Sequence, residues 1–319
     1  SEMCIRDRLS PRGTDSFVQS RCGACARCGG FVQRWCKTTS IFDNDSLRNL
    51  GMLSSMSKEQ RLVRVHDVRH EIPHVISIDF EPCGMPPITS VDDHVKVVLP
   101  PDRSDRRHDD DSVSQPLLRT YTRRRWFEDG RWGIDVLQFG PETGTAAHDG
   151  PGTQWSRTVQ PGDEVVVRGP GGHWQMPDDL THLLVVADAV ALPAVANTLA
   201  VLPRSAAATV VLAGGHHDYP LTADERFTVV RVPRNPDGSH DPASVMSTVR
   251  ELELPDDVHA FVHGEATMVR SVRRHLRLQR NLTKDHVHLS AYWFAGRDAD
   301  GWRAIKKDFN QSMEAESGD

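Results

Sequence analysis

Between residues 61 and 171, apolar side chains alternate with polar or charged ones over short stretches, a pattern typical of half-buried β-strands. The first three stretches are RLVRVHDV, HVISIDFEP and HVKVVLPP. After the charged loop PDRSDRRHDDDSVSQP come LLRTYTRRRW, RWGIDVLQF and DEVVVRGPGG. Six such stretches, separated by turn residues and without a long helix between them, predict a small antiparallel barrel.

The pattern changes near residue 177, where continuous apolar runs replace the alternation. HLLVVAD, ATVVLAGG, RFTVVRVP, HAFVHGEA and HVHLSAYWFAG read as strands. AVALPAVANTLAVLP, SVMSTVREL, MVRSVRRHLRLQR and DGWRAIKKDFNQSME read as helices. Strands that alternate with helices predict a parallel α/β sheet, and helices on both faces explain why its strands are apolar throughout. We therefore expect a barrel domain over residues 58–176 and an α/β domain over residues 177–319 that ends in a helix.

Length and charge fit this two-domain arrangement. The chain has 319 residues, of which 38% are hydrophobic and 26% charged, as in soluble globular proteins. Its formal net charge of −6 argues against general nucleic-acid binding, which needs a basic surface. No apolar run approaches the ~20 residues that span a bilayer, and the polar N-terminus lacks the apolar segment of a signal peptide. We expect a cytoplasmic monomer without a membrane or nucleic-acid partner.

Residues 1–57 differ from the rest and are expected to be a disordered or non-native extension. This segment shows little hydrophobic periodicity, and its opening SEMCIRDR resembles a sequence remnant. It holds a run of closely spaced cysteines, Cys22, Cys25, Cys28 and Cys36. The spacing resembles part of an iron–sulfur run or a zinc site but matches neither well. We therefore assign no metal ligands here, and whether the cluster binds a metal stays open; an iron–sulfur centre would favour an internal electron relay.

Residues 119–126, RTYTRRRW, place four arginines within eight positions of an acidic chain. Arg119 can donate two parallel hydrogen bonds to a phosphate or carboxylate. Tyr121, two residues on, projects from the same face of the strand. Together they could hold a flat anionic ligand; the alternative is a strand with a solvated basic edge.

Five motifs occur in order along the chain: Arg119-x-Tyr121-Thr122 with Arg124 behind it, GPGTQW at 150–155, DAVALPA at 188–194, HGEA at 263–266 and AYWFAG at 291–296. Together, over about residues 60–315, they resemble the siderophore-interacting protein family, flavin-dependent ferric-siderophore reductases related to the ferredoxin reductases. The resemblance implies that the six-stranded antiparallel barrel binds FAD. It also implies that the α/β domain is a Rossmann-like domain for NADPH or NADH.

For FAD, the resemblance implies two binding segments. On the RTYT strand, Arg119 would clamp the phosphates, Tyr121 would cover the isoalloxazine and Thr122 would bond to it near N5, with Arg124 behind them. The GPGTQW turn would take the pyrophosphate, because glycine lets the backbone approach and a helix N-terminus favours negative charge. The contacts expected there are Gly150, Gly152 and Thr153. A family histidine that precedes this turn corresponds to His148, or its place is taken by QFG at 138–140 with an insertion between.

The nicotinamide nucleotide is expected at the carboxyl edge of the parallel sheet, where ligands bind in such folds. The residues that the resemblance implies for it are Asp188, Pro193, Gly264, Glu265 and Trp293. The chain departs from the family pattern at three positions, where Ala187 and Ala291 replace glycine and Phe294 replaces arginine.

The reaction that the resemblance implies transfers hydride from NAD(P)H to FAD and then single electrons to Fe(III) held by a siderophore. Fe(II) binds hard oxygen donors more weakly and leaves. The cofactor does the chemistry, so no catalytic acid or base is predicted. A basic mouth would steer anionic chelates, and we assign it to Lys96, Arg103 and Arg297. The helix after HGEA could also meet an anion through Arg270, Arg273 and Arg274, although a basic helix face is more often solvated.

Two alternatives stay open from the sequence. The chain could be a ferredoxin reductase-like flavoprotein with another electron acceptor. It could also be a catalytically silent module that binds a siderophore or a nucleotide, since the departures from the family pattern leave room for lost turnover.

Overall fold

A computed structural model describes the chain over residues 60–100, 116–138, 150–214, 218–233, 235 and 241–317. Six of the predictions concern residues outside these ranges, namely Cys22, Cys25, Cys28, Cys36, Arg103 and His148.

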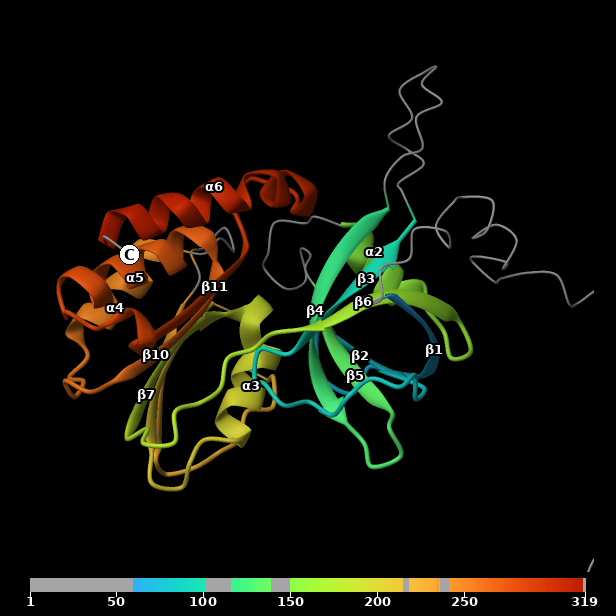
Figure 1. Cartoon of the computed structure of the whole chain (residues 1–319), viewed down its shortest axis with the longest axis horizontal. Helices are drawn as coiled ribbons and strands as arrows, with labels where there is room; N and C mark the ends of the chain where they lie inside the picture. The colour runs from blue at the N-terminus through green and yellow to red at the C-terminus, as the bar shows by residue number, and fades with distance from the viewer. Residues whose placement is uncertain are drawn as a thin grey trace, which may run out of the picture. The chain divides into compact units, whose positions relative to one another are not determined.

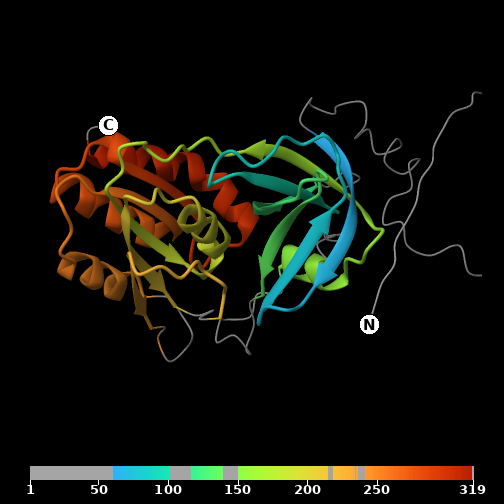
Figure 2. The same cartoon turned by 90° about the horizontal axis from the view of Figure 1, so that it is seen from below.

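The first half of the described chain forms a closed antiparallel barrel with strand order β1-β2-β5-β4-β3-β6 (Figure 1). Its strands are β1 (Gln60–Arg69), β2 (Val75–Phe80), β3 (His94–Leu99), β4 (Leu117–Trp126), β5 (Trp132–Leu137) and β6 (Glu164–Gly171). Helix α2 (Pro151–Thr158) comes between β5 and β6 and lies against the barrel, as Figure 2 shows. The predicted six-stranded barrel is confirmed.

Period-two alternation builds the barrel core. In β3, Val95, Val97 and Leu99 are buried, whereas Lys96 between them is exposed. In β2 and β5 every residue is buried, because Phe80 and Trp132 stack at 4.4 Å inside the barrel while the opposite faces of these strands carry paired polar groups.

The second half forms a five-stranded parallel sheet with strand order β11-β10-β7-β8-β9. Its strands are β7 (His182–Asp188), β8 (Ala207–Ala213), β9 (Phe227–Val232), β10 (His259–Glu265) and β11 (Val287–Trp293). Strand β7 lies at the centre, so its apolar run is buried from Leu183 onward. The prediction of a parallel α/β sheet is confirmed.

Helices cover both faces of this sheet (Figure 1). They are η3 (Ala189–Ala191), α3 (Leu192–Ala200), α4 (Pro242–Glu251), α5 (Ala266–Leu278), η4 (Lys284–His286) and α6 (Ala299–Ser317). Leu183 and Val185 of β7 pack with α3, whereas Leu184 and Val186 pack with α4, α5 and α6 on the other face. In the described part of the chain, no helix is both long and apolar enough to cross a membrane.

The consecutive arginines of β4 have different partners. Arg123 is fully buried and donates to both carboxylate oxygens of Asp93 at 2.7 Å. The pairing of β4 with β5 shifts register between Arg123 and Arg125, and Arg125 pairs with Asp135 on the neighbouring β5 and with Asp79 on β2 beyond it. These two arginines therefore hold the barrel together through buried ion pairs and do not form a solvated edge.

Candidate functional site

Strand β4 and the first turn of α2 meet in a tight polar contact. A β-carbon placed on Gly152 would lie 2.5 Å from the Tyr121 hydroxyl oxygen and 3.2 Å from Cγ of Arg119. Only glycine therefore lets the backbone of α2 come this close to the two side chains. The structure brings together Arg119, Tyr121 and Gly152, three residues predicted from separate motifs.

The N-terminus of α2 faces this contact without a side-chain cap of its own. The N-cap residue is Gly150, which has no side chain to cap the helix, so no side-chain cap hydrogen bond is made there. Pro151 occupies the first turn, where its missing N–H costs nothing. The N–H groups that begin a helix carry partial positive charge and favour an anion. Thr153 lies in the same turn, within reach of a group bound at this terminus.

An aromatic pair stands behind the turn. The rings of Tyr121 and Trp155 have centroids 6.0 Å apart. Burial raises the pKa of Tyr121, although the nearby Arg119 guanidinium acts in the opposite direction. Tyr121 therefore stays protonated and presents a hydroxyl donor and a ring face beside the helix terminus.

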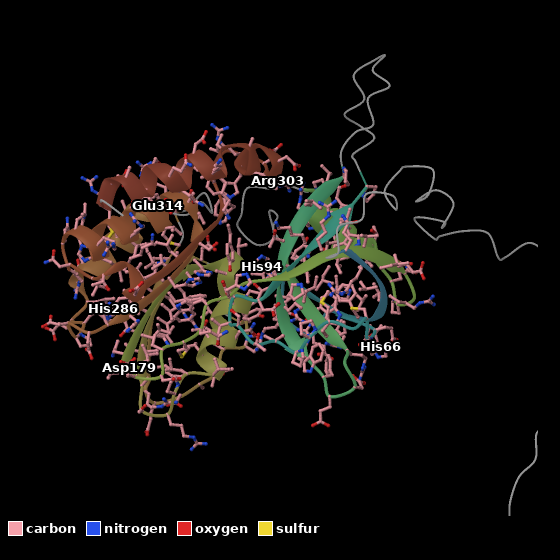
Figure 3. All side chains as sticks on the ribbon, in the orientation of Figure 1. His66, His94, Asp179, His286, Arg303 and Glu314 are labelled. Carbon is pink, nitrogen blue, oxygen red and sulfur yellow. The ribbon has the colours of Figure 1, made fainter. Side chains whose placement is uncertain are left out.

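Arg119 is held by the C-terminal helix. Its guanidinium lies 3.3 Å from a carboxylate oxygen of Asp300 in α6. Arg303, labelled in Figure 3, lies one turn further along α6. It pairs with Asp300 at 2.8 Å and donates to the backbone oxygen of Leu118 at 2.6 Å. These contacts fasten α6 to the strand that carries Arg119. These contacts could not be predicted from local sequence patterns, because α6 and β4 are far apart along the chain.

Replacing Asp300 by asparagine should strengthen the FAD binding that the family resemblance implies by up to about fivefold, because a partly exposed ion pair that competes for Arg119 is worth about 0.2–1 kcal/mol. Titration of the flavin-free protein with FAD, followed by flavin fluorescence, measures this change. Asp308→Asn, an exposed position on the same helix, is the matched control and should leave the affinity unchanged. A weaker affinity in Asp300→Asn would mean that Asp300 orients Arg119 instead of competing for it.

Thr122 faces the parallel sheet, opposite to Tyr121. It is buried and hydrogen-bonds with the side chain of Tyr292. The Tyr292 hydroxyl lies 2.8 Å from Nδ1 of His263, whose pKa is well below the ordinary histidine value because of burial and the neighbouring His288. A neutral polar chain therefore runs from Thr122 into β10, and Thr122 is separated from Arg119 and Tyr121 by the alternation of the strand.

Arg124 lies against α3. Its guanidinium is 3.3 Å from the amide oxygen of Asn197, and Asn197 in turn donates to the backbone oxygen of Arg123 at 2.9 Å. Arg124 also hydrogen-bonds with Tyr219. Its position beside the α/β domain differs from that of Arg119 and Tyr121, which face α2. Its predicted role in cofactor binding stays a prediction.

Four of the residues predicted for the nucleotide come together at the carboxyl edge of the sheet. The Asp188 carboxylate accepts hydrogen bonds from the backbone N–H of Glu265 at 2.8 Å and from the Trp293 indole at 2.7 Å. Gly264 has φ of +140°, and a β-carbon there would lie 2.6 Å from the Asp188 carboxyl group. The carboxylate therefore ties the ends of β7, β10 and β11 together and shapes this edge.

Glu265 and Pro193 complete the edge from the helix side. Glu265 caps α5 by accepting from the backbone N–H of Met268 at 2.9 Å, and it also accepts from Ala295 at 3.2 Å. Pro193 is buried in the first turn of α3. Both residues fix the turns that a nucleotide would approach.

Lys306 of α6 lies near Lys96 of the predicted basic mouth, although the sequence analysis did not predict it. Lys96 on β3 is exposed, and its charge acts on Lys306 of α6. Arg297 is exposed as well and lies over the ring of Phe294 at 5.9 Å. Lys306 was missed because its proximity to Lys96 depends on how α6 packs, and its own segment reads only as an amphipathic helix.

Comparison with known proteins assigns both halves of the chain. The model of the siderophore-interacting FAD-binding domain matches residues 64–174, and that of the siderophore-interacting protein matches residues 180–296. An uncharacterized protein of Mycobacterium tuberculosis is 29% identical over 278 residues, covering 78% of this chain and 94% of that protein. The NADPH-dependent ferric-chelate reductase of Escherichia coli is 28% identical over 156 residues, covering 46% of this chain and 58% of the reductase.

Solved structures agree. The crystal structure of a siderophore utilization protein from T. fusca has a TM-score of 0.63 at 26% identity, covering 76% of this chain and 95% of that one. The barrel and the parallel sheet thus correspond to an FAD-binding domain and to the domain that follows it in the ferredoxin reductase-like fold. The chain belongs to the siderophore-interacting protein family.

Proposed function

We propose that this protein reduces ferric siderophores with electrons from NADPH or NADH through bound FAD, and so releases Fe(II) for iron acquisition. The observation that carries the proposal is the contact of Gly152 with Arg119 and Tyr121 at the N-terminus of α2. It provides a guanidinium, helix N–H groups and an aromatic ring in one place, which suits a diphosphate joined to a flat ring. The E. coli relative named as a ferric-chelate reductase supports the same reaction class.

The chain's own residues would bind and orient in this reaction. FAD, when bound, supplies the ability to accept a hydride and to give up electrons one at a time. Arg119 and the first turn of α2 would hold the diphosphate, with Gly150, Gly152 and Thr153 at the closest approach. Tyr121 would cover the ring, and Thr122 would offer a hydroxyl on the other face of the strand, held in place by Tyr292.

At the carboxyl edge of the sheet, the hydrogen bonds around Asp188 would hold the strand ends rigid beneath the nicotinamide nucleotide, and the indole hydrogen bond would orient Trp293. Lys96 and Lys306 would attract anionic ferric chelates, since a cluster of like charges raises the local concentration of an oppositely charged substrate. The cytoplasmic location, the monomeric state and the substrate contacts of Arg103 and Arg297 remain predictions.

Reduction of an anionic ferric chelate should slow as pH rises, and should do so below the pH at which an ordinary lysine loses its charge. Burial and then the charge of Lys96 lower the pKa of Lys306, so its ammonium deprotonates early. Lys96→Gln removes the repulsion between Lys96 and Lys306 and should move the midpoint of the kcat/KM profile to higher pH. The value of kcat/KM itself should fall, because one attracting charge is lost. The measurement is the pH profile of kcat/KM from neutral pH up to the ordinary lysine pKa of about 10.4.

Lys307→Gln is the matched control, since Lys307 is exposed on the adjacent position of α6 and should leave the midpoint in place. A ferric chelate of zero net charge should show no such decline. Equal midpoints in Lys96→Gln and the unsubstituted protein would contradict the steering role of Lys306.

The proposed reaction is tested anaerobically with the full chain. The visible spectrum is recorded after FAD is supplied, then NADPH or NADH is added, followed by a ferric siderophore and an Fe(II) trap. Flavin bands that bleach with the nucleotide and return as Fe(II) appears are the expected result. Bleaching without Fe(II) would point to another electron acceptor. No uptake of FAD would overturn the proposal and leave a binding module.

A further inference from the structure

A chain of three hydrogen-bonding side chains runs from the barrel into the parallel sheet. Thr122 of β4 hydrogen-bonds with Tyr292 of β11, and the Tyr292 hydroxyl lies 2.8 Å from Nδ1 of His263 in β10. Thr122 is buried, and His263 is fully buried with its ring stacked on Phe261. The chain therefore connects a residue of the proposed flavin site with an enclosed histidine.

The second ring nitrogen of His263 leaves the direction of this chain open. Nε2 is buried and has no hydrogen-bond partner among the residues that the structure describes. In a neutral imidazole, the hydrogen bond made by one nitrogen decides whether the other carries the proton, and no bond at Nε2 fixes it here. Nδ1 can therefore either accept a hydrogen bond from the Tyr292 hydroxyl or donate one to it.

Each direction of the chain gives Thr122 a different role, because a hydroxyl group has one donor and two lone pairs. When Nδ1 of His263 accepts, Tyr292 accepts from Thr122, and the remaining lone pair of Thr122 can accept from a ligand. When Nδ1 donates, Tyr292 donates to Thr122, and the Thr122 hydroxyl is free to donate to a ligand. The protonation of His263 thus decides what Thr122 offers.

The proposed reaction requires both roles. A hydride brings one proton and two electrons to N5 of the flavin, and the two electrons then reduce two Fe(III) ions to two Fe(II) ions. One proton is left over and must leave N5. Thr122, which the family resemblance places near N5, must therefore accept from N5–H when FAD is reduced and donate to N5 when FAD is oxidised.

The surroundings keep His263 uncharged until it receives a proton. Burial and then His288 hold the pKa of His263 well below the ordinary histidine value, whereas Asp92 acts in the opposite direction. Lys306 of α6 and His94 of β3 lower this pKa as well. Nδ1 is therefore available as an acceptor at neutral pH, and a proton taken there is not retained.

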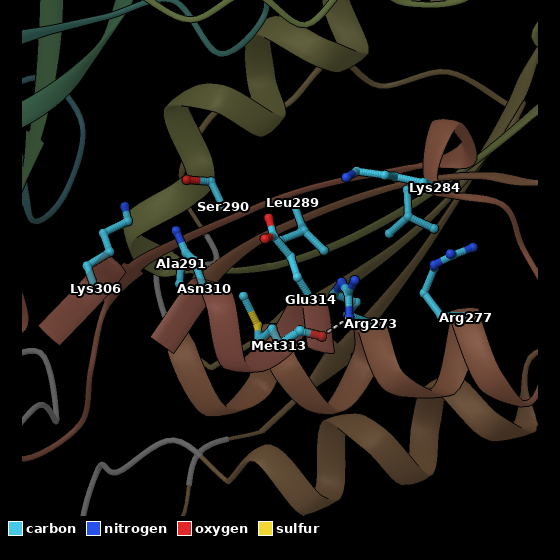
Figure 4. A pocket seen from close by; sticks show the side chains of 11 residues that line it. Arg273, Arg277, Lys284, Leu289, Ser290, Ala291, Lys306, Asn310, Met313 and Glu314 are labelled. Carbon is cyan, nitrogen blue, oxygen red and sulfur yellow. Dashed lines mark hydrogen bonds between the residues drawn. The ribbon is translucent and has the colours of Figure 1, made fainter. Parts of the chain in front are cut away.

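The way out to solvent lies on the barrel side of β11. The ring centroids of His263 and His288 are 5.0 Å apart, and Nε2 of His288 lies 3.4 Å from the Asp92 carboxylate. The His288 and Asp92 side chains are 21% and 16% exposed. The cavity that Figure 4 shows between α5, β11 and α6 is lined by Leu289 and Ala291 but not by His288, so it is not part of this route.

We propose that the proton left at N5 passes through the hydroxyl groups of Thr122 and Tyr292 to Nδ1 of His263. The N5–H bond breaks, each hydroxyl gives up its own proton as it takes one from its neighbour, and an N–H bond forms at Nδ1. Both hydroxyls are restored, and Thr122 is left donating to N5, as the oxidised ring requires. This path rests on the proposed function in one respect, the binding of FAD with N5 at Thr122.

The first test is ¹⁵N NMR of the histidine rings in the full chain saturated with FAD, which shows which ring nitrogen carries the proton. His263 should be neutral at neutral pH, with its proton on Nδ1 when FAD is oxidised and on Nε2 after reduction by dithionite. His263→Asn identifies its signal. A structural hydrogen bond alone would keep one tautomer in both states, and that result would overturn the proposal.

The second test is the rate at which ferricyanide reoxidises the reduced flavin, which needs neither a siderophore nor a nicotinamide nucleotide. Tyr292→Phe keeps the ring and breaks the chain, and should slow reoxidation by about 100-fold, as positioned proton transfer contributes. His263→Asn can still hydrogen-bond to Tyr292 but cannot take the proton, and should be as slow. Tyr219→Phe removes another buried hydroxyl bond, to Asp135 at 2.6 Å, and should leave the rate unchanged.

The outcomes separate this proton path from the reductase activity. An unchanged rate in both Tyr292→Phe and His263→Asn, or an equal slowing in Tyr219→Phe, would overturn the path even if the protein reduces ferric siderophores. A tautomer that changes with the state of the flavin, together with slow variants, would support the path even if no Fe(II) is released. If FAD is not taken up, both proposals are wrong.

Discussion

Replacing Arg123 by leucine should lower the free energy of unfolding by about 3–5 kcal/mol, the usual cost of leaving one charge of a buried ion pair alone. Arg123 is fully buried, its partner Asp93 is 6% exposed, and two hydrogen bonds of 2.7 Å join them. Without the guanidinium, the Asp93 carboxylate stays enclosed with its charge uncompensated. Urea unfolding followed by circular dichroism measures the change at a constant m-value.

Two variants separate the ion pair from a general effect of the strand. Arg124→Leu, one residue along, breaks only a 3.3 Å contact with Asn197 and a bond with Tyr219, and should cost about 1 kcal/mol. Adding Asp93→Asn to Arg123→Leu removes the stranded charge and should recover part of the lost stability. A double variant no more stable than Arg123→Leu would show that packing, and not charge, explains the loss.

Replacing Gly152 by alanine should weaken FAD binding by about 100-fold, which corresponds to about 2.8 kcal/mol. The added methyl group would lie 2.5 Å from the Tyr121 hydroxyl and 3.2 Å from the Arg119 side chain. It would displace both side chains from the α2 terminus and keep the backbone N–H groups from a phosphate. Quenching of flavin fluorescence during titration of the flavin-free protein measures the dissociation constant.

The nearest atom to the added methyl is a hydroxyl oxygen, and this allows a rescue. Tyr121→Phe removes that oxygen and keeps the ring, so combining it with Gly152→Ala should restore most of the affinity. Tyr121→Phe alone serves as the control for loss of the hydroxyl. If Gly152→Ala binds FAD as tightly as the unsubstituted protein, or if the double variant binds FAD as weakly as Gly152→Ala, the binding site does not depend on glycine at this position.

Local pattern was sufficient for the elements and the fold class. Alternation in HVKVVL predicts a strand with one buried face, and a continuous apolar run such as HLLVVAD predicts a strand buried on both faces. The order of strands and helices in turn predicts which layers cover each strand. The same reasoning places Arg119 and Tyr121 on one face of β4, because side chains two residues apart in a strand point the same way. Gly152 was predicted from its motif, and the structure brings it against both.

Partners far apart in sequence were decided by tertiary packing. RTYTRRRW alone does not show that Arg123 and Arg125 turn inward to Asp93, Asp79 and Asp135, since that depends on a register shift between two strands. Likewise, the C-terminal helix reads only as amphipathic until it packs beside β4 and β11. That packing sets Asp300 against Arg119 and brings Lys306 near Lys96. Ion pairs act over a few ångströms of space, whatever the separation along the chain, so sequence supplies the charges and only the folded structure assigns their partners.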